Sequence, residues 1–292
     1  MKKKTDWWIY LVCVILFCVI GVCSYKISYK LIDYYQSAAN YKELADKYAT
    51  IKTEPAVKTP VPTKEPEKEQ EETKEEPLPD ALKDDGTFPI EINFDELKEK
   101  NSDVIGWIYL PGTKLNYPIV RGEDNDFYLH QTIEKTYSFG GTIFLDVNCA
   151  RDWSSRHNII YGHNMNDGSM FRPIIRYKEQ DYYDKNPFMY LSTPDGNYRL
   201  DIFAGFITES ESEVYSTFFT SGESFAKWAE KMAEKSSITT DLIPSENSKI
   251  ITLSTCTYER QDMRYVLMAI MRPVTDNAEE LLAAPPADAD KK

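Results

Sequence analysis

Between Val104 and Arg272 the chain repeats one pattern, a short run of apolar and β-branched residues followed by a turn. Two such runs, VIGWIYL and LNYPIV, stand on either side of Pro111-Gly112. Short runs bounded by Gly, Pro, Asn and Asp are typical of β-strands, and many of them in succession predict a barrel or a sandwich. A parallel α/β sheet would require strands and helices to alternate regularly, and they do not.

Six further runs complete the predicted strands: residues 142–147, 158–161, 188–192, 198–208, 249–254 and 265–272. Apolar residues at helical spacing predict helices over 27–51 and 221–236, and shorter helices are expected over 94–100 and 169–177. We therefore expect a mainly β domain over residues 88–274, folded as a closed β-barrel with inserted helices.

The N-terminal region predicts a membrane anchor. Trp7 to Cys23 is an uncharged run that is long enough to cross a bilayer, and three lysines precede it. We expect a cytoplasmic N-terminus over 1–6 and a transmembrane helix over 7–25. A cleaved signal peptide would need a small-x-small site after the run, which is absent. A lipoprotein site at Cys23 fits poorly because bulky Val22 precedes it.

Three more segments flank the predicted domain. Residues 26–51 are expected to continue the anchor as a juxtamembrane helix. Residues 52–87 are rich in Pro, Glu, Lys and Thr, which predicts a disordered linker that tethers the domain at a distance from the membrane. The acidic, alanine-rich residues 275–292 are expected to be a disordered tail.

Composition excludes several classes of function. A formal net charge of −13 argues against a nucleic-acid partner, which would require a basic surface. Three of the five cysteines lie in the N-terminal apolar run, so only Cys149 and Cys256 remain for the predicted domain. A disulfide framework and a cysteine-rich zinc site are therefore excluded. The three histidines form no HExxH pair, and we expect neither a metal nor a cofactor.

Cys256 is the candidate nucleophile. It follows Ser254-Thr255 at the end of a predicted strand and precedes a polar stretch, a position that is typical of functional residues. A buried, inert cysteine is an equally good interpretation of Cys256 alone. His163 ends another predicted strand and would serve as the base, while Arg264 enters the next strand and could bind an oxyanion.

The other candidates carry less weight. We expect His130 and His157 to be surface residues, because the first ends a strand and the second lies in a charged loop. Cys149 is expected to be a second exposed thiol with no role in the chemistry.

TLSTC at residues 252–256, with His163 upstream and Arg264 downstream, resembles the sortase signature Thr-Leu-x-Thr-Cys and its His and Arg partners. Three longer stretches are similar to class B sortases: GWIYLPGTKLNYPIV, GTIFLD, and NIIYGHNMNDGSMF followed by YYDKNPFMYL. The predicted helix over 221–236 fits the extra helix of that class. The similarity spans roughly Asn93 to Pro273.

This resemblance implies a membrane-anchored cysteine transpeptidase of the Gram-positive cell surface, with an extracellular catalytic domain. It would cleave surface proteins after the threonine of a C-terminal LPxTG or NPxTG-like sorting motif. Cys256 would form a thioacyl intermediate, and His163 and Arg264 would assist it. A peptidoglycan amine, from lipid II or a stem peptide, would then accept the protein. The resemblance further implies substrate-binding roles at Asn125, Tyr161, Ser254 and Thr255, where packing or loop capping is an equally good interpretation.

Two other functions stay open. An L,D-transpeptidase also combines His, Cys and Arg on a β-rich fold, but its arginine lies closer to its cysteine than Arg264 does to Cys256. The second alternative is a tethered surface-binding module without enzymatic activity, in which Cys256 is a core residue. A papain-like peptidase is disfavoured because its cysteine precedes its histidine.

Overall fold

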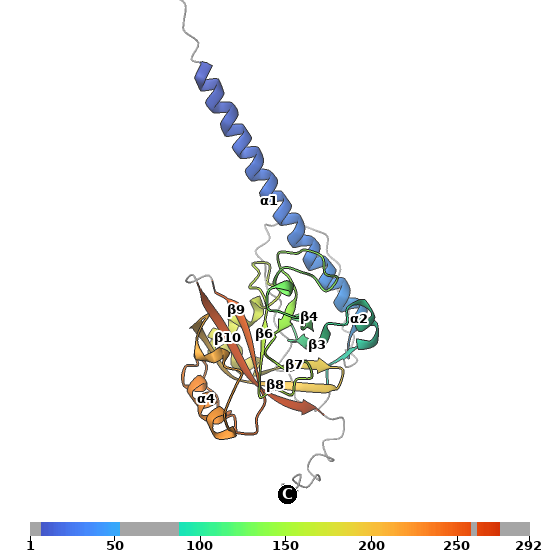
Figure 1. Ribbon diagram of the computed structural model, residues 1–292, viewed down its shortest axis with the longest axis vertical. Helices are drawn as coiled ribbons and strands as arrows, with labels where there is room; N and C mark the ends of the chain where they lie inside the picture. The colour runs from blue at the N-terminus through green and yellow to red at the C-terminus, as the bar shows by residue number, and fades with distance from the viewer. Residues whose placement is uncertain (1–6, 53–87, 258–261, 275–292) are drawn as a thin grey trace, which may run out of the picture.

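The computed structural model describes residues 7–52, 88–257 and 262–274, and the predictions for residues 1–6, 53–87 and 275–292 fall outside this part. Figure 1 shows a long N-terminal helix whose C-terminal end lies against a β-barrel. The mainly β, closed barrel that the sequence predicts is confirmed.

The barrel contains eight strands. They are β3 (Val104–Tyr109), β4 (Asn116–Val120), β5 (Ile143–Leu145), β6 (His157–Tyr161), β7 (Phe188–Thr193), β8 (Gly196–Glu209), β9 (Ile250–Cys256) and β10 (Met263–Val274). Their order around the barrel is β10-β8-β7-β3-β4-β5-β6-β9, and β9 pairs with β10 to close it. The β4–β5 and β6–β9 pairs are parallel, and the other pairs are antiparallel. Closure leaves no free sheet edge in the barrel.

The helices occupy the connections between strands. They are α2 (Phe94–Lys100), η1 (Phe127–Leu129), η2 (Arg172–Lys178), α3 (Gln180–Lys185), η3 (Glu213–Tyr215) and α4 (Gly222–Glu234). The single helix expected over 169–177 is instead η2 followed by α3. In α4, Ser221 forms a capping box with Ser224, and the predicted apolar face of Phe225, Trp228, Ala229 and Met232 is buried.

The N-terminal helix α1 (Trp7–Tyr48) covers the segments predicted as anchor and juxtamembrane helix. Within the described residues, no helix combines the length and the apolar character that a membrane crossing requires.

The C-terminal part of α1 belongs to the barrel domain. Tyr41, Leu44 and Tyr48 are buried in the same core cluster as the barrel strands. Immediately after α1, β1 (Ala49–Ile51) pairs antiparallel with β2 (Ile90–Ile92). Residues that pack in the core cluster thus precede residue 88, the start expected for the domain, and the domain bounds stay a prediction.

The β1–β2 pair brings the residues on either side of the predicted linker close together. Ile51 pairs with Ile90, and the Lys52 backbone N–H donates to the Pro89 carbonyl (2.8 Å). The two ends of the linker are thus fixed beside each other on the domain. The tether role predicted for this linker, residues 52–87, stays a prediction. Its predicted disorder concerns residues that lie outside the described part.

Candidate active site

Cys256 and Arg264 are direct partners across the last strand pair. They face each other in the antiparallel register of β9 and β10, although eight positions separate them in the sequence. Directly opposed residues of an antiparallel pair project to the same side of the sheet. The hairpin between the two strands therefore places the guanidinium beside the thiol.

His163 follows β6 and lies next to the end of β9 that carries Cys256. Tyr161 pairs with Ser254 in the parallel β6–β9 ladder, and the Gly162 N–H continues the ladder to the Ser254 carbonyl (3.2 Å). The chain then leaves the sheet at His163, next to the end of β9. Glycine is favoured at residue 162, because a Cβ there would lie 2.7 Å from the Phe171 ring and would force a shift.

Asn164 fixes the loop of His163 to the strand of Cys256. Its Nδ2 donates to the Cys256 carbonyl (2.9 Å), and Arg172 Nη1 donates to its Oδ1 (3.3 Å). On the opposite side, the Phe171 N–H donates to the His163 carbonyl (2.9 Å). These bonds hold the histidine and the cysteine in a fixed relation before any substrate binds.

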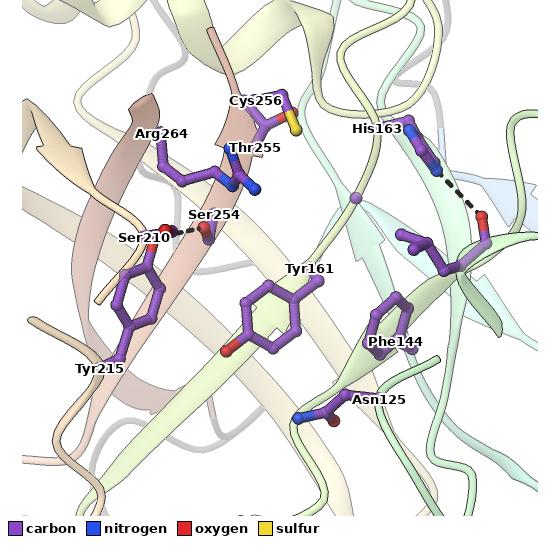
Figure 2. Close-up of a pocket in the computed structure, with 12 residues that line it drawn as sticks. Asn125, Phe144, Tyr161, His163, Ser210, Tyr215, Ser254, Thr255, Cys256 and Arg264 are labelled. Carbon is purple, nitrogen blue, oxygen red and sulfur yellow. Dashed lines mark hydrogen bonds between the residues drawn. The ribbon is translucent and has the colours of Figure 1, made fainter. Parts of the chain in front are cut away.

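The three residues line one cavity of about 260 Å³ together with the four predicted substrate-binding residues. Figure 2 shows the Cys256 sulfur and the Arg264 guanidinium directed into the space that separates them from His163. Among the described residues, the guanidinium donates one hydrogen bond, from Nη1 to the Met263 carbonyl (3.3 Å). Most of its five N–H donors are therefore left for a ligand.

The protonation state of His163 follows from its contacts. Its Nε2 lies 2.9 Å from the Leu129 carbonyl oxygen, which can only accept, so Nε2 carries the proton. Burial lowers the pKa of His163 below its ordinary value, and the bond to Leu129 opposes this shift. A neutral imidazole with Nε2–H leaves a lone pair on Nδ1, and this atom can take a proton from a thiol.

Two of the predicted substrate-binding residues share a buried carboxylate. Asp146 Oδ2 accepts from the Tyr161 hydroxyl (2.9 Å) and from Asn125 Nδ2 (3.0 Å). Its Oδ1 accepts from the Asn148 N–H (2.8 Å) and from Asn148 Nδ2 (3.0 Å). Because Asp146 is itself held by four donors, it keeps Asn125 and Tyr161 in place at the pocket.

The other two predicted substrate-binding residues, Ser254 and Thr255, lie on β9. The Ser254 hydroxyl lies 2.9 Å from the Tyr215 hydroxyl, and the Tyr215 ring stacks on Tyr161 at 6.3 Å between centroids. Thr255 is buried, and its Oγ1 has no hydrogen-bond partner in the described part of the chain. The structure thus brings all seven predicted site residues together, and their individual roles remain predictions.

Five residues that line the cavity were not predicted as site residues: Leu129, Phe144, Gly162, Ser210 and Tyr215. Tyr215 lies in η3 within the polar stretch SESEVYST, where no periodicity marks it. Leu129 acts through its carbonyl, and sequence carries no signal for a backbone contact. Only Phe144, on a predicted strand facing Tyr161, could have been found from strand pairing.

A second cysteine and histidine meet in the core, where both surface predictions are wrong. His157 is fully buried, with Nδ1 2.8 Å from the Ser216 carbonyl and Nε2 2.7 Å from Thr252 Oγ1. Cys149 is also buried, its thiol donates to the His157 carbonyl (3.5 Å), and burial raises its pKa to about 11. A protonated, enclosed thiol cannot attack a substrate, so this pair is structural. His130, the third histidine, is partly buried and stacks on His163.

Among the described residues, no group of His, Cys, Asp and Glu side chains is arranged to hold a metal ion. The chemistry that this cavity offers is that of a thiol, an imidazole and a guanidinium. Such a set can attack an acyl carbon, transfer its proton and bind the developing oxyanion.

Comparison with known proteins identifies the family. The family model for the Sortase domain matches residues 108–272, a range that contains the whole site. Sortase B of Listeria monocytogenes is 33% identical over 165 residues, which cover 56% of this chain and 67% of the relative.

Solved structures show the same similarity. The Staphylococcus aureus sortase B–substrate complex matches with a TM-score of 0.60 and 30% identity, covering 62% of this chain and 85% of that chain. Sortase B from Bacillus anthracis, in complex with AAEK1, matches with a TM-score of 0.64 and 26% identity. This second match covers 83% of this chain and 99% of the other.

Proposed function

The chain belongs to class B of the sortase family of cysteine transpeptidases, and from this premise we propose that Cys256, His163 and Arg264 carry out the transfer. The observation that carries this proposal is the register of β9 and β10, which opposes Cys256 to Arg264 in the cavity of His163. The proposed substrate is a protein with an LPxTG or NPxTG-like sorting motif, cleaved after its threonine. A structure of similar fold is a sortase B–substrate complex, which supports a sortase substrate for this chain.

The first half of the reaction forms a thioester. Nδ1 of His163 takes the thiol proton as Cys256 Sγ attacks the threonine carbonyl carbon. The carbonyl oxygen gains negative charge, which the Arg264 guanidinium stabilises. The threonine C–N bond then breaks, and His163 delivers its proton to the departing amine.

The second half reverses these roles. An incoming primary amine attacks the thioester carbon, His163 accepts a proton from that amine, and the proton returns to Cys256 as the thiolate leaves. The proposed acceptor is a peptidoglycan amine, from lipid II or a stem peptide. A sortase B has been solved in complex with triglycine, a peptide with a free amine, and this supports an amine acceptor.

The proposed location is the cell membrane, with residues 1–6 in the cytoplasm, residues 7–25 as a single-pass anchor and the barrel outside. The support is the uncharged sequence of 7–25 and the exposure of apolar α1 side chains, such as Phe17 at 75%. Membrane fractionation tests the anchor. Replacing Val14 and Leu16 by aspartate should release the protein into the soluble fraction, and retention of that variant in membranes would contradict the anchor.

The test of the activity is a sorting-peptide library incubated with the full chain, with and without triglycine, and analysed by mass spectrometry. We expect cleavage after one threonine and a new threonine–glycine bond when triglycine is present. Cys256→Ala should form neither product. Cleavage of peptidoglycan stem peptides without cleavage of any sorting peptide would refute the proposal.

A further inference from the structure

The carbonyl that fixes His163 belongs to a loop with unusually tight backbone packing. The Leu129 carbonyl oxygen accepts a hydrogen bond from His163 Nε2–H, with a distance of 2.9 Å between the two heavy atoms. Gly141 lies against the same peptide group, since a Cβ at residue 141 would be 2.3 Å from the Leu129 oxygen. Gly141 also has φ +53°, a left-handed conformation that favours glycine. The position of the Leu129 carbonyl therefore depends on where the Gly141 backbone is held.

Gly141 is held by the N-terminal helix. The Tyr41 hydroxyl of α1 donates to the Gly141 carbonyl (2.6 Å) and lies 2.9 Å from Thr142 Oγ1. Thr142 in turn donates to the Gln131 carbonyl (2.7 Å) through its hydroxyl and to the Tyr128 carbonyl (3.0 Å) through its N–H. The Tyr41 hydroxyl thus contacts Gly141 and Thr142, and Thr142 binds the Tyr128 and Gln131 carbonyls on either side of Leu129.

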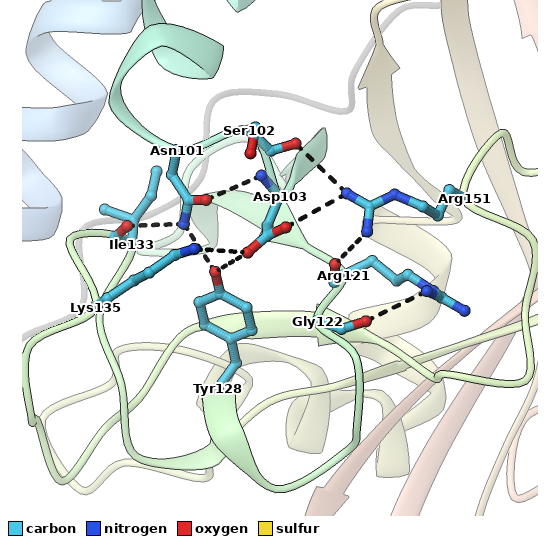
Figure 3. A network of polar contacts seen from close by, with 9 residues as sticks. All are labelled: Asn101, Ser102, Asp103, Arg121, Gly122, Tyr128, Ile133, Lys135 and Arg151. Carbon is cyan, nitrogen blue, oxygen red and sulfur yellow. Dashed lines mark hydrogen bonds and ion pairs between the residues drawn. The ribbon is translucent and has the colours of Figure 1, made fainter.

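A second tyrosine, Tyr128, fixes the segment that contains Leu129. Tyr128 donates to Asp103 Oδ2 (2.7 Å) and accepts from Asn101 Nδ2 (2.8 Å). Figure 3 shows that Lys135 and Arg151 approach the same carboxylate, with Nζ–Oδ2 and Nη2–Oδ1 separations of 3.1 and 3.6 Å. This network fixes the Tyr128 side chain to the barrel. The Leu129 N–H donates to the Asp126 carbonyl (3.2 Å) and the His130 N–H to the Phe127 carbonyl (3.4 Å), and the close approach of Gly141 adds a contact at the Leu129 oxygen itself.

We propose that Tyr41 is a positioning residue for the reaction, which acts through Gly141 and the Leu129 carbonyl to hold His163 in its Nε2–H tautomer. The inference rests on the proposed role of His163 as the base and extends the active-site scaffold to the N-terminal helix. Loss of the Tyr41 hydroxyl removes the bond to the Gly141 carbonyl and the contact with Thr142, which lets Gly141 and the Leu129 carbonyl beside it shift relative to Nε2. The ring can then carry its proton on Nδ1, where the lone pair for the Cys256 thiol is required.

Tyr41→Phe tests the proposal in the full chain, because it removes one oxygen and keeps the buried ring. We expect kcat to fall about tenfold with KM unchanged, since a small displacement of a catalytic group affects the chemical step. We also expect the ¹⁵N shifts of the His163 ring to show a reduced Nε2–H population and a new Nδ1–H population.

Tyr183→Phe is the matched control. Tyr183 is a buried tyrosine on α3 whose hydroxyl also donates to a threonine, Thr240 Oγ1, at 2.7 Å. Loss of the Tyr183 hydroxyl should lower stability about as much as Tyr41→Phe does, and it should leave kcat and the His163 tautomer unchanged. Equal kcat in the two variants, or an unaltered tautomer in Tyr41→Phe, would overturn the proposal.

If Tyr41→Phe does not fold, Thr142→Val tests the same connection with a side chain of nearly the same shape. It should change the tautomer in the same direction, and an unchanged tautomer would again overturn the proposal. Failure of the proposed function is recognised separately. A His163→Gln enzyme that retains transpeptidation would remove the base from the mechanism whatever Tyr41 does.

Discussion

The buried His157 should make the fold sensitive to mild acid. The ring is buried, which favours its neutral form; Nδ1–H then donates to the Ser216 carbonyl, and Nε2 is left to accept from the Thr252 hydroxyl. Burial lowers the pKa of His157 from 6.5 to about 4. Between these two values the unfolded chain binds a proton that the folded chain does not, so stability falls as the pH is lowered through this range.

The size of the effect follows from the two pKa values. A difference from 6.5 to about 4 corresponds to about 3 kcal/mol when the loss is complete. About 2.5 kcal/mol of this should be lost between pH 7.5 and pH 4.5. Since domains are stable by only about 5–15 kcal/mol, this loss is a large fraction of the total.

The assay is denaturant unfolding at four pH values from 7.5 to 4.5, with each free energy of unfolding extrapolated to zero denaturant. His157→Gln is the comparison, because its amide is neutral throughout and can still bind Thr252. The variant should be less stable at pH 7.5 but lose about 2.5 kcal/mol less on acidification. His163, whose pKa is also lowered, contributes equally to both proteins and cancels. If both proteins lose the same free energy between pH 7.5 and 4.5, the buried neutral state assigned to His157 is wrong.

Three further changes test the site. Cys149→Ser should retain transpeptidation because that thiol is buried, and peptide mapping after alkylation should find Cys256 modified in the native protein; a folded but inactive Cys149→Ser enzyme would contradict this. Arg264→Lys should lower kcat/KM about a hundredfold, because an ammonium cannot reproduce the fork of guanidinium donors, and activity near the original level would exclude an oxyanion role. Gly162→Ala should cost about 1–3 kcal/mol and lower kcat through a clash with Phe171, which a second change, Phe171→Leu, should partly relieve; a tolerated alanine would show that the close approach is not needed.

The three residues proposed to be catalytic were more predictable than the scaffold around them. Cys256, His163 and Arg264 each stand at the end of a run of strand residues, where the chain leaves the core. Histidine and cysteine are few in the predicted domain, and Arg264 stands out among nine arginines by its place shortly after Cys256, so the three could be selected without knowledge of strand order. The register that opposes Cys256 to Arg264 is a property of the folded hairpin.

Contacts that join distant segments could not be predicted. The apolar spacing in 27–51 predicts a helix, but helical periodicity does not identify the surface that a tyrosine such as Tyr41 will bind. The charged neighbours of His157 predicted exposure, whereas its strand partner Ile250 and the ring of Trp228 enclose it. In both cases the decisive partner is about 70 or more residues away in the sequence, beyond the reach of local patterns.

The fixed attachment of α1 makes the helix a molecular ruler. From Tyr25, at the end of the proposed anchor, to Tyr41 the helix rises about 24 Å at 1.5 Å per residue. Since Tyr41 contacts the loop that lines the cavity, the height of the cavity above residue 25 is set by helix length. Lengthening residues 53–87 should leave this height unchanged, whereas inserting helical turns between residues 26 and 36 should raise it. A substrate held in the same membrane would then have to present its sorting motif at a matching distance from the bilayer.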